Sequence, residues 1–185
     1  MLSDIIASAD HKMGQTVEHS KEEFATIRTG RAHPAMFAKI TADYYGTPTP
    51  IQQLASFNAP EARTMLISPY DMSCLPAIER AIRDSDLGVN PSNDGHVIRI
   101  VLPVLTEERR KEYTKLARSK AEEGRVAIRN ARRHAIDACK KMEKNKEVGE
   151  DDVTKAEKKL EEITKKHVEA IDELLKRKEA ELLEV

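Results

Sequence analysis

Proline occurs in only one part of this chain, and its absence elsewhere constrains the fold more than any other feature. All eight prolines of the 185-residue sequence lie between residues 34 and 103, so the 33 residues before and the 82 residues after contain none. Because proline lacks a backbone N–H and clashes with the preceding helical turn, the middle segment cannot form one long helix. Both flanks can, and we predict long helices there.

The N-terminal flank has the pattern of a single amphipathic helix. Apolar residues recur from Ile6 to Ile27 at alternating steps of three and four, which is the spacing of one helix face. Ser3 can cap the start of this helix, and Gly30 is a natural residue just beyond its end. We therefore predict a helix that ends near Thr29 and Gly30.

The C-terminal flank predicts two further helices. The first runs from Thr106, a possible cap, to about Lys146. A tight turn at Asn145–Gly149 separates it from a second helix that opens with Glu150 and two aspartates. One apolar stripe per helix and a short turn predict antiparallel packing. The sequence thus predicts a discontinuous three-helix bundle made of residues 1–30 and 105–185.

The middle segment, residues 31–104, reads as a small β/α/β domain. Short runs rich in β-favouring residues alternate with turn residues, and one run has helical spacing. The predicted strands are Phe37–Tyr45, Ile51–Ala59, Thr64–Tyr70 and His96–Leu102, with a helix at Leu75–Asp84 and a turn at Ser92–Gly95. The fold class predicted for the whole chain is α+β.

Two chain crossings connect the bundle to the middle domain. Paired short connections define a hinge axis, because both must flex together. The residues predicted to form this hinge are Thr29, Gly30, Arg31 and Ala32 in the first crossing, and Pro103, Val104, Leu105 and Thr106 in the second.

The overall net charge of −1 hides a basic helix. Residues 105–148 contain 14 Lys/Arg against 8 Asp/Glu, whereas residues 149–185 contain 8 against 12. Four arginines, Arg125, Arg129, Arg132 and Arg133, occupy nine residues without an intervening acid. Arginine binds phosphate bidentately, so this stripe predicts contact with phosphate or RNA. The alternative is a solvated face paired with nearby acids such as Glu122.

Aromatic residues are too few in the flanks for RNA bases to stack on them. Only Phe24 and Tyr113 lie in the predicted helices. A basic helix of this kind would contact the RNA backbone and groove rather than stack on bases.

Catalytic and metal-binding motifs are absent from the sequence. We find no phosphate-binding glycine loop, nucleophile elbow, zinc-protease motif or array of Cys and His ligands. Cys74 and Cys139 are isolated, which favours two reduced thiols. The longest apolar run is too short to span a membrane, and the N-terminus lacks the pattern of a signal peptide. We expect a cytoplasmic protein that is not an enzyme and binds no cofactor, metal or small-molecule substrate.

Several long segments resemble the bacterial ribosome recycling factor family. They are IRTGRAHP (27–34), DYYGTPTPIQQLAS (43–56), SDLGVNPSNDG (85–95), LPVLTEERRKEYTKLAR (102–118) and RVAIRNARRHAID (125–137). The resemblance covers essentially the whole chain in one order, and agreement of several long motifs is highly specific.

The resemblance implies an L-shaped, two-domain factor that acts after peptide release. Such a factor binds the post-termination ribosome through large-subunit ribosomal RNA. With elongation factor G and GTP hydrolysis it then splits the subunits and releases the ribosome from mRNA. The resemblance also implies that the factor itself catalyses no reaction.

The resemblance further selects particular arginines as ribosomal RNA contacts. Arg110 in TEERRK, and Arg129 and Arg132 in RVAIRNARR, match the family's contact residues, while Arg28 and Arg31 flank the hinge as further candidates. The residues that meet elongation factor G have no signature in the sequence.

Two other functions fit the same patterns without the resemblance. The chain could be a coiled-coil interaction protein whose apolar stripe pairs with another protein, or a general RNA chaperone. A recycling factor is expected to be a monomer that binds the large subunit, whereas a coiled-coil protein should dimerise.

Overall fold

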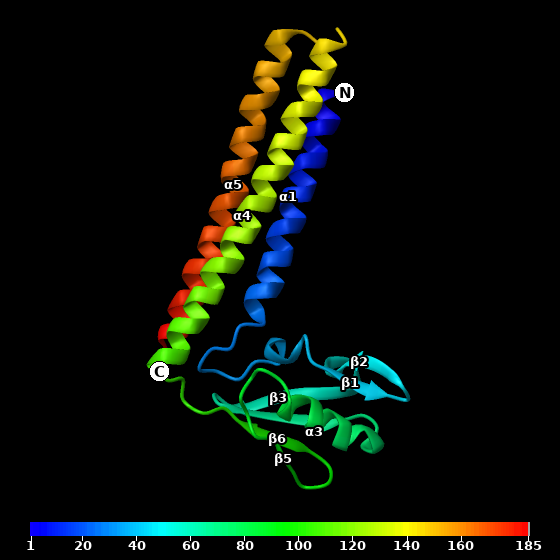
Figure 1. Ribbon diagram of the computed structural model, residues 1–185, viewed down its shortest axis with the longest axis vertical. Coiled ribbons are helices and arrows are strands. Elements are labelled where there is room, and N and C mark those ends of the chain that lie inside the picture. Colours follow the sequence, from blue (N-terminus) through cyan, green and yellow to red (C-terminus); the bar gives the residue numbers. More distant parts are fainter. Residues whose placement is uncertain (185) are drawn as a thin grey trace. The chain divides into compact units, whose positions relative to one another are not determined.

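The computed structural model describes residues 1–184, and contacts divide them into two compact units (Figure 1). The helical unit contains Met1–Phe24 and Lys115–Glu179. The sheet unit contains Ala25–Thr114 and the residues from Ala180 onward. The predicted domain boundaries, at residues 30 and 105, both fall inside the sheet unit, which begins at Ala25 and continues to Thr114. A division by contacts does not locate a hinge, so the hinge stays a prediction.

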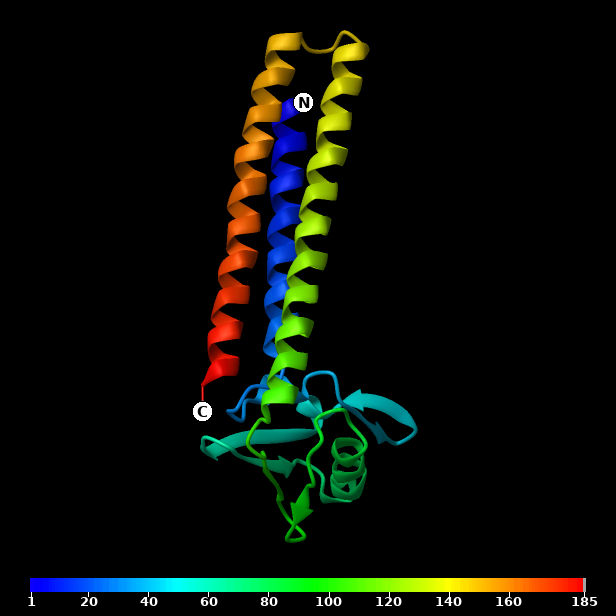
Figure 2. The same cartoon turned by 60° about the vertical axis from the view of Figure 1, so that its left-hand side comes forward.

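The helical unit is built from three long helices, which confirms that part of the sequence prediction. They are α1 (Leu2–Ala25), α4 (Glu107–Lys144) and α5 (Glu150–Leu183). In both views the three run side by side, with α4 antiparallel to the other two (Figures 1 and 2). The first turns of α4 and the last residues of α5 group with the sheet unit.

Local signals define the ends of α4. The Thr106 hydroxyl accepts a hydrogen bond from the Arg109 N–H at 3.1 Å, and Glu107 and Glu108 occupy the positive end of the helix dipole. Beyond Lys144 the chain turns with Lys146 at a φ of 60°, in the left-handed region. The predicted cap and turn are both confirmed.

The first helix ends earlier than its apolar pattern predicts. It stops at Ala25 rather than near Thr29. Ile27 and Arg28 continue the chain with only 4% and 5% of their surface exposed, and both belong to the sheet unit. Tertiary burial therefore overrides the helical spacing at this point.

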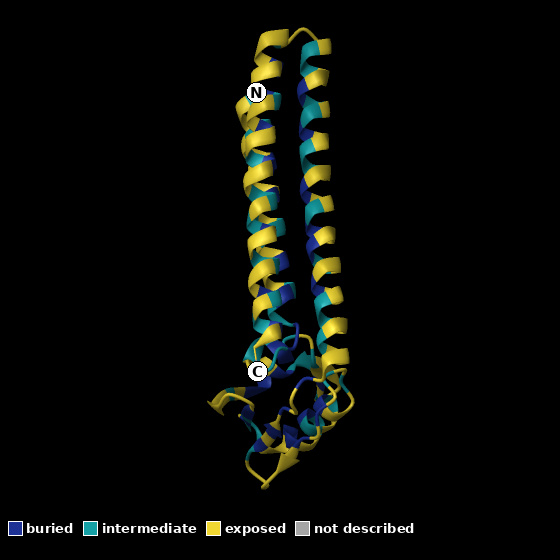
Figure 3. Ribbon diagram, turned by 90° about the vertical axis from the view of Figure 1, so that its left-hand side faces the viewer, coloured by how far each residue is buried: buried dark blue, intermediate teal, exposed yellow. Residues whose placement is uncertain are grey.

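The seam of α4 is made of small side chains. Its buried residues are Ala117, Ala121, Gly124, Ile128, Ala135 and Cys139, and buried positions on all three helices face inward (Figure 3). A Cβ atom added to Gly124 would lie 2.7 Å from Ile171 Cδ1 on α5 and 2.7 Å from Ser20 Oγ on α1. Glycine at this position lets the three helices approach closely.

The sheet unit contains a four-stranded antiparallel sheet in the order β3-β4-β6-β5. The strands are β3 (Ala55–Glu61), β4 (Thr64–Pro69), β5 (Ser92–Asn93) and β6 (Ile98–Val101). Helix α3 (Leu75–Arg83) contributes Ile78 and Ile82 to the core that it shares with the sheet. The predicted strands at 64–70 and 96–102 and the helix at 75–84 are confirmed within two residues.

A separate hairpin precedes this sheet. Strand β1 (Thr41–Tyr44) pairs with β2 (Thr47–Pro50), between a short 3-10 helix, η1 (Pro34–Phe37), and one helical turn, α2 (Ile51–Leu54). The prediction of strand from Phe37 and from Ile51 was therefore wrong for the first four residues of each segment. Phe37 and Ile51 are fully buried, and helical turns bring these isolated apolar residues into the core.

The hairpin turns on two residues with positive φ. Tyr45 has a φ of 50° and Gly46 a φ of 84°, which suits a two-residue turn between right-twisted strands. Glycine adopts this conformation freely, but an L-residue with a side chain pays about 1–2 kcal/mol. Tyr45 is thus a locally unfavourable choice for the tip of the hairpin.

Arg28 joins the two segments that were predicted to form the hinge. Its guanidinium donates a hydrogen bond to the Pro103 carbonyl. The neighbouring residue Leu102 donates its N–H to the Arg63 carbonyl at 2.7 Å. The Arg28 Nε is buried without a hydrogen-bond partner. A buried guanidinium that holds a carbonyl 75 residues away is a structural tie within the sheet unit.

We expect Gly124→Ala to lower the free energy of unfolding by about 1–3 kcal/mol, because the added methyl group overpacks the seam. The matched control is Gly14→Ala in α1, where the new Cβ meets only His167 Cε1, at 3.8 Å. That variant should gain about 0.5–1 kcal/mol from helix propensity. Urea unfolding followed by helical circular dichroism measures both.

Removing one of the two obstructing atoms should partly restore the stability of the Gly124→Ala variant. Ile171→Val deletes Cδ1, so its cost should be smaller in the Gly124→Ala background than alone, which a double-mutant cycle detects. If Gly124→Ala stabilised the protein as much as Gly14→Ala does, the close approach of Ile171 and Ser20 to Gly124 would be contradicted.

We expect Arg28→Ala to loosen the segment around residue 103. Loss of the buried hydrogen bond leaves the Pro103 carbonyl without its donor and should cost about 1–3 kcal/mol locally. Hydrogen exchange at the Leu102 amide should accelerate by one to two orders of magnitude. The control, Arg31→Ala, removes a more exposed arginine three residues away and should leave that amide unchanged.

Candidate nucleic-acid interface

The arginine stripe of α4 divides into two groups, and acids of α5 make the division. Arg118 Nε lies 2.9 Å from Glu179 Oε1, and Arg125 Nε lies 2.7 Å from Asp172 Oδ1. These acids are 61 and 47 residues away in the chain, so local charge patterning does not reveal them. Both arginines are tied to the neighbouring helix.

Arg125 is held most firmly. Its side chain is 19% exposed, and its Nη1 also donates to Glu122 Oε2 at 3.0 Å. Partial burial lowers the pKa of the guanidinium, but the hydrogen bonds to Asp172 and Glu122 outweigh this and raise it above its ordinary value. Because Glu122 and Asp172 already accept hydrogen bonds from its guanidinium, Arg125 has few donors left for a phosphate.

Arg129, Arg132 and Arg133 form the second group, which we call the free arginine face. Arg129 is 50% exposed and reaches only Glu122 Oε1, at 3.4 Å, a weak surface pair. Arg132 is half-buried and Arg133 is exposed, and neither has an ion pair within residues 1–184. Two adjacent arginines without counter-charges leave donors available to phosphate oxygens.

Arg110 lies in the sheet unit and lines a cavity of about 620 Å³. Arg31, Arg63, Glu181 and the hinge candidates Gly30, Val104 and Leu105 line the same cavity. The Arg110 Nε is buried without a hydrogen-bond partner. The structure therefore brings Arg31 and Arg110 together at the predicted hinge, while buried Arg28 presents no such surface.

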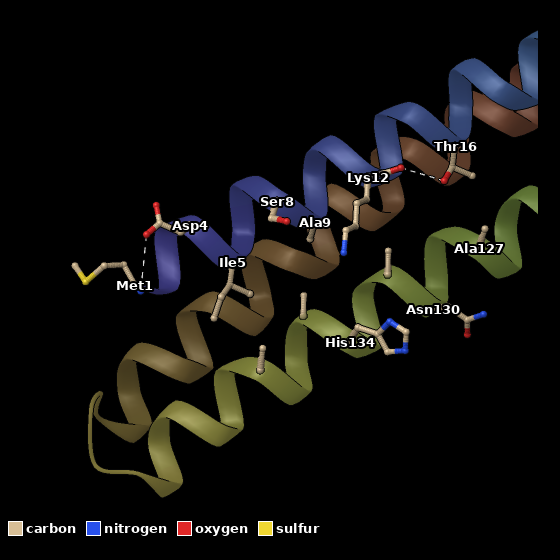
Figure 4. A pocket seen from close by; sticks show the side chains of 13 residues that line it. Met1, Asp4, Ile5, Ser8, Ala9, Lys12, Thr16, Ala127, Asn130 and His134 are labelled. Atoms are coloured by element: carbon tan, nitrogen blue, oxygen red, sulfur yellow. Dashed lines mark hydrogen bonds and ion pairs between the residues drawn. The ribbon is translucent and has the colours of Figure 1, made fainter.

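A second cavity, of about 650 Å³, lies between α1 and α4 in the helical unit (Figure 4). Ile5 and Ala9 from α1 line it, together with four alanines of α4. Lys12 and His134 provide polar groups among these apolar ones. The alanine side chains are too short to fill the space between the two helices near the N-terminus.

The described part of the chain offers little other chemistry. Among residues 1–184, no three His, Cys, Asp or Glu side chains are grouped so that they could hold a metal ion. Cys74 and Cys139 are both buried and free, as predicted, and burial raises the pKa of the Cys139 thiol. The helices described for this chain are all too polar or too short to cross a membrane.

The comparisons with known proteins agree across the chain. The family model described as ribosome recycling factor matches residues 20–183. The ribosome-recycling factor of Cutibacterium acnes is 66% identical over 184 residues, and that of Streptomyces coelicolor is 58% identical over 185, with complete coverage of both proteins in each case.

Solved structures give the same result. A solution structure of the ribosome recycling factor aligns with a TM-score of 0.77 at 40% identity, covering 100% of this chain and 98% of that one. A structure of the T. thermophilus ribosome recycling factor and the E. coli elongation factor G bound to the E. coli post-termination complex aligns with a TM-score of 0.71 at 43% identity, covering both chains completely. Sequence, fold and length therefore agree that this chain belongs to the ribosome recycling factor family.

Proposed function

We propose that this chain recycles ribosomes after termination. It binds the post-termination ribosome on large-subunit ribosomal RNA, and with elongation factor G and GTP hydrolysis it separates the subunits and releases the ribosome from mRNA. It acts in the cytoplasm as a monomer and contributes binding and mechanical coupling rather than catalysis.

One observation carries the RNA-binding part of this proposal. Arg132 and Arg133 stand next to each other on α4 with no ion pair in residues 1–184, although acids of α5 neutralise other arginines of the same helix. Unpaired positive charges clustered on a folded surface favour association with an anionic partner. Family membership and the relative bound to a post-termination complex with elongation factor G support ribosomal RNA as that partner.

We assign the direct RNA contacts to Arg129, Arg132 and Arg133 in the helical unit and to Arg110 and Arg31 in the sheet unit. Arg125 contributes less, because two carboxylates already occupy its guanidinium. Arg28 contributes through the chain geometry that it fixes.

The two competing functions are less well supported. A coiled-coil interaction protein needs an open apolar stripe, but the α4 stripe packs against α1 and α5 of the same chain. A general RNA chaperone would use the same arginines and differs only in its preference for unstructured RNA. Binding assays distinguish it from a recycling factor.

We further propose that the hinge lies in residues 29–32 and 103–106. The two segments are joined by the Arg28–Pro103 hydrogen bond, so a push on the sheet unit moves both together. Such coupling would let elongation factor G displace residues 33–102, which lie between the two hinge segments, while the long helices keep their hold on RNA.

We expect Arg132→Glu to weaken binding to purified large subunits by about 10- to 100-fold, because it replaces a charge-assisted phosphate contact with repulsion. The plot of log binding constant against log salt concentration should become shallower, with the magnitude of its negative slope reduced by about one. Filter binding across a salt series measures both. Lys115→Glu, the same charge change on an exposed residue of α4, is the matched control and should cost less than threefold.

Helicity and melting temperature should stay near wild type in both variants, since neither residue has an ion pair among residues 1–184 to lose. Equal affinity of Arg132→Glu and wild type would refute the RNA contact. Equally tight binding of wild type to an unstructured RNA of matched length would favour the chaperone instead.

We expect a disulfide that locks the sheet unit to the helical unit to preserve ribosome binding and stop subunit splitting. Cys74→Ala and Cys139→Ala first remove the native thiols, so that only an engineered pair can react. Light scattering with elongation factor G and GTP follows splitting, and a reductant should restore it in the same sample. Normal splitting by the locked protein would exclude a hinge.

A further inference from the structure

Exposed apolar side chains gather at one place in the sheet unit. Tyr45 is 80% exposed, Tyr70 is 72% exposed and Met72 is 47% exposed. The Tyr45 hydroxyl lies 3.4 Å from Asp71 Oδ2, which brings the hairpin tip to residues 70–72. The Tyr44 ring meets the Tyr45 ring edge-on, with centroids 4.6 Å apart. We call Tyr44, Tyr45, Tyr70 and Met72 around Asp71 the tyrosine patch.

Folding does not account for tyrosine at the tip of the hairpin. Position 45 has a φ of 50°, where glycine or asparagine is favoured, and the ring gains little burial in return. Strained residues that persist without a structural reward are found where a surface is used. Single exposed apolar residues are ordinary, but here Tyr45 contacts Asp71, and the two chain neighbours of Asp71, Tyr70 and Met72, are exposed as well.

The charge of the patch selects the kind of partner. Asp71 accepts hydrogen bonds from the Ser73 hydroxyl at 2.7 Å and from the Ser73 N–H at 3.0 Å. These bonds hold the pKa of the Asp71 carboxyl below its ordinary value, so the group stays ionised at neutral pH. An ionised carboxylate repels phosphate, so an RNA that stacks on these rings is disfavoured.

An ionised carboxylate beside aromatic faces is a suitable site for a cationic side chain. The carboxylate pairs with a guanidinium or ammonium group, and the rings attract the same cation through their π faces. We propose that the tyrosine patch docks a protein surface that projects an arginine or lysine side chain onto Asp71. The partner belongs to the recycling assembly, so this inference rests on the proposed function.

A photo-crosslinker at position 45 tests the class of partner directly. Tyr45→p-benzoylphenylalanine keeps an aromatic side chain at the tip, and the full-length protein is bound to purified post-termination complexes with elongation factor G. We expect a cross-link to a protein, mapped by mass spectrometry to a peptide with an exposed Lys or Arg. A cross-link to RNA, or none while the factor is bound, would overturn the proposal.

Two substitutions test whether the tyrosine patch contributes to subunit splitting. Tyr45→Asn removes the ring and suits the left-handed turn, so stability should be equal or higher. Asp71→Asn removes the charge and keeps an acceptor for the Ser73 N–H. Each should slow subunit splitting about tenfold at limiting elongation factor G, with affinity for large subunits within twofold of wild type. If both variants split ribosomes at the wild-type rate, the proposal that the tyrosine patch docks a partner would be refuted.

The control is Thr47→Ala, which changes an exposed residue of the same hairpin outside the patch and should split ribosomes normally. Failure of the wild-type protein to split ribosomes would refute the proposed function. The cross-linking result alone would then show whether the tyrosine patch contacts a protein.

Discussion

The close packing of three helices around the small-residue seam of α4 is the constraint on which the proposed RNA surface depends. Gly124 leaves no room for a Cβ between Ile171 and Ser20, so α5 lies tightly against α4. That proximity carries Asp172 and Glu179 to Arg125 and Arg118. Core packing thereby decides which arginines are neutralised, and it leaves Arg132 and Arg133 without ion pairs within residues 1–184.

The sequence predicted the helical unit well because its signals are local. Proline placement, three-four spacing, the Thr106 cap and the turn before Glu150 each act within a few residues, and the structure has all of them. The division of the arginines could not be predicted in the same way. It depends on acids 47 and 61 residues away, and their alignment requires the register of α5 against α4.

The sheet unit was less predictable because burial and propensity disagree there. Phe37 and Ile51 are β-favouring residues, yet both enter the core from helical turns. Pro48 and Pro50 discourage a strand, but β2 pairs only with β1, and proline is tolerated in a strand with a free edge. The hydrogen bond from buried Arg28 to the Pro103 carbonyl had no signal in the sequence. An arginine next to a predicted hinge is equally compatible with an exposed side chain that binds RNA.

The positions that violate local rules coincide with the surfaces to which we assign function. Arg132 and Arg133 are consecutive like charges without an ion pair in the described residues, and Tyr45 puts an aromatic ring where glycine or asparagine is favoured. In the cap of α4 and in its alanine seam, local and global preferences agree. Such conflicts reduce stability without a folding benefit, so they persist where an external partner supplies the missing interaction. In our proposals, anionic RNA would supply it for the arginines, and a cationic protein surface would supply it for the tyrosine patch.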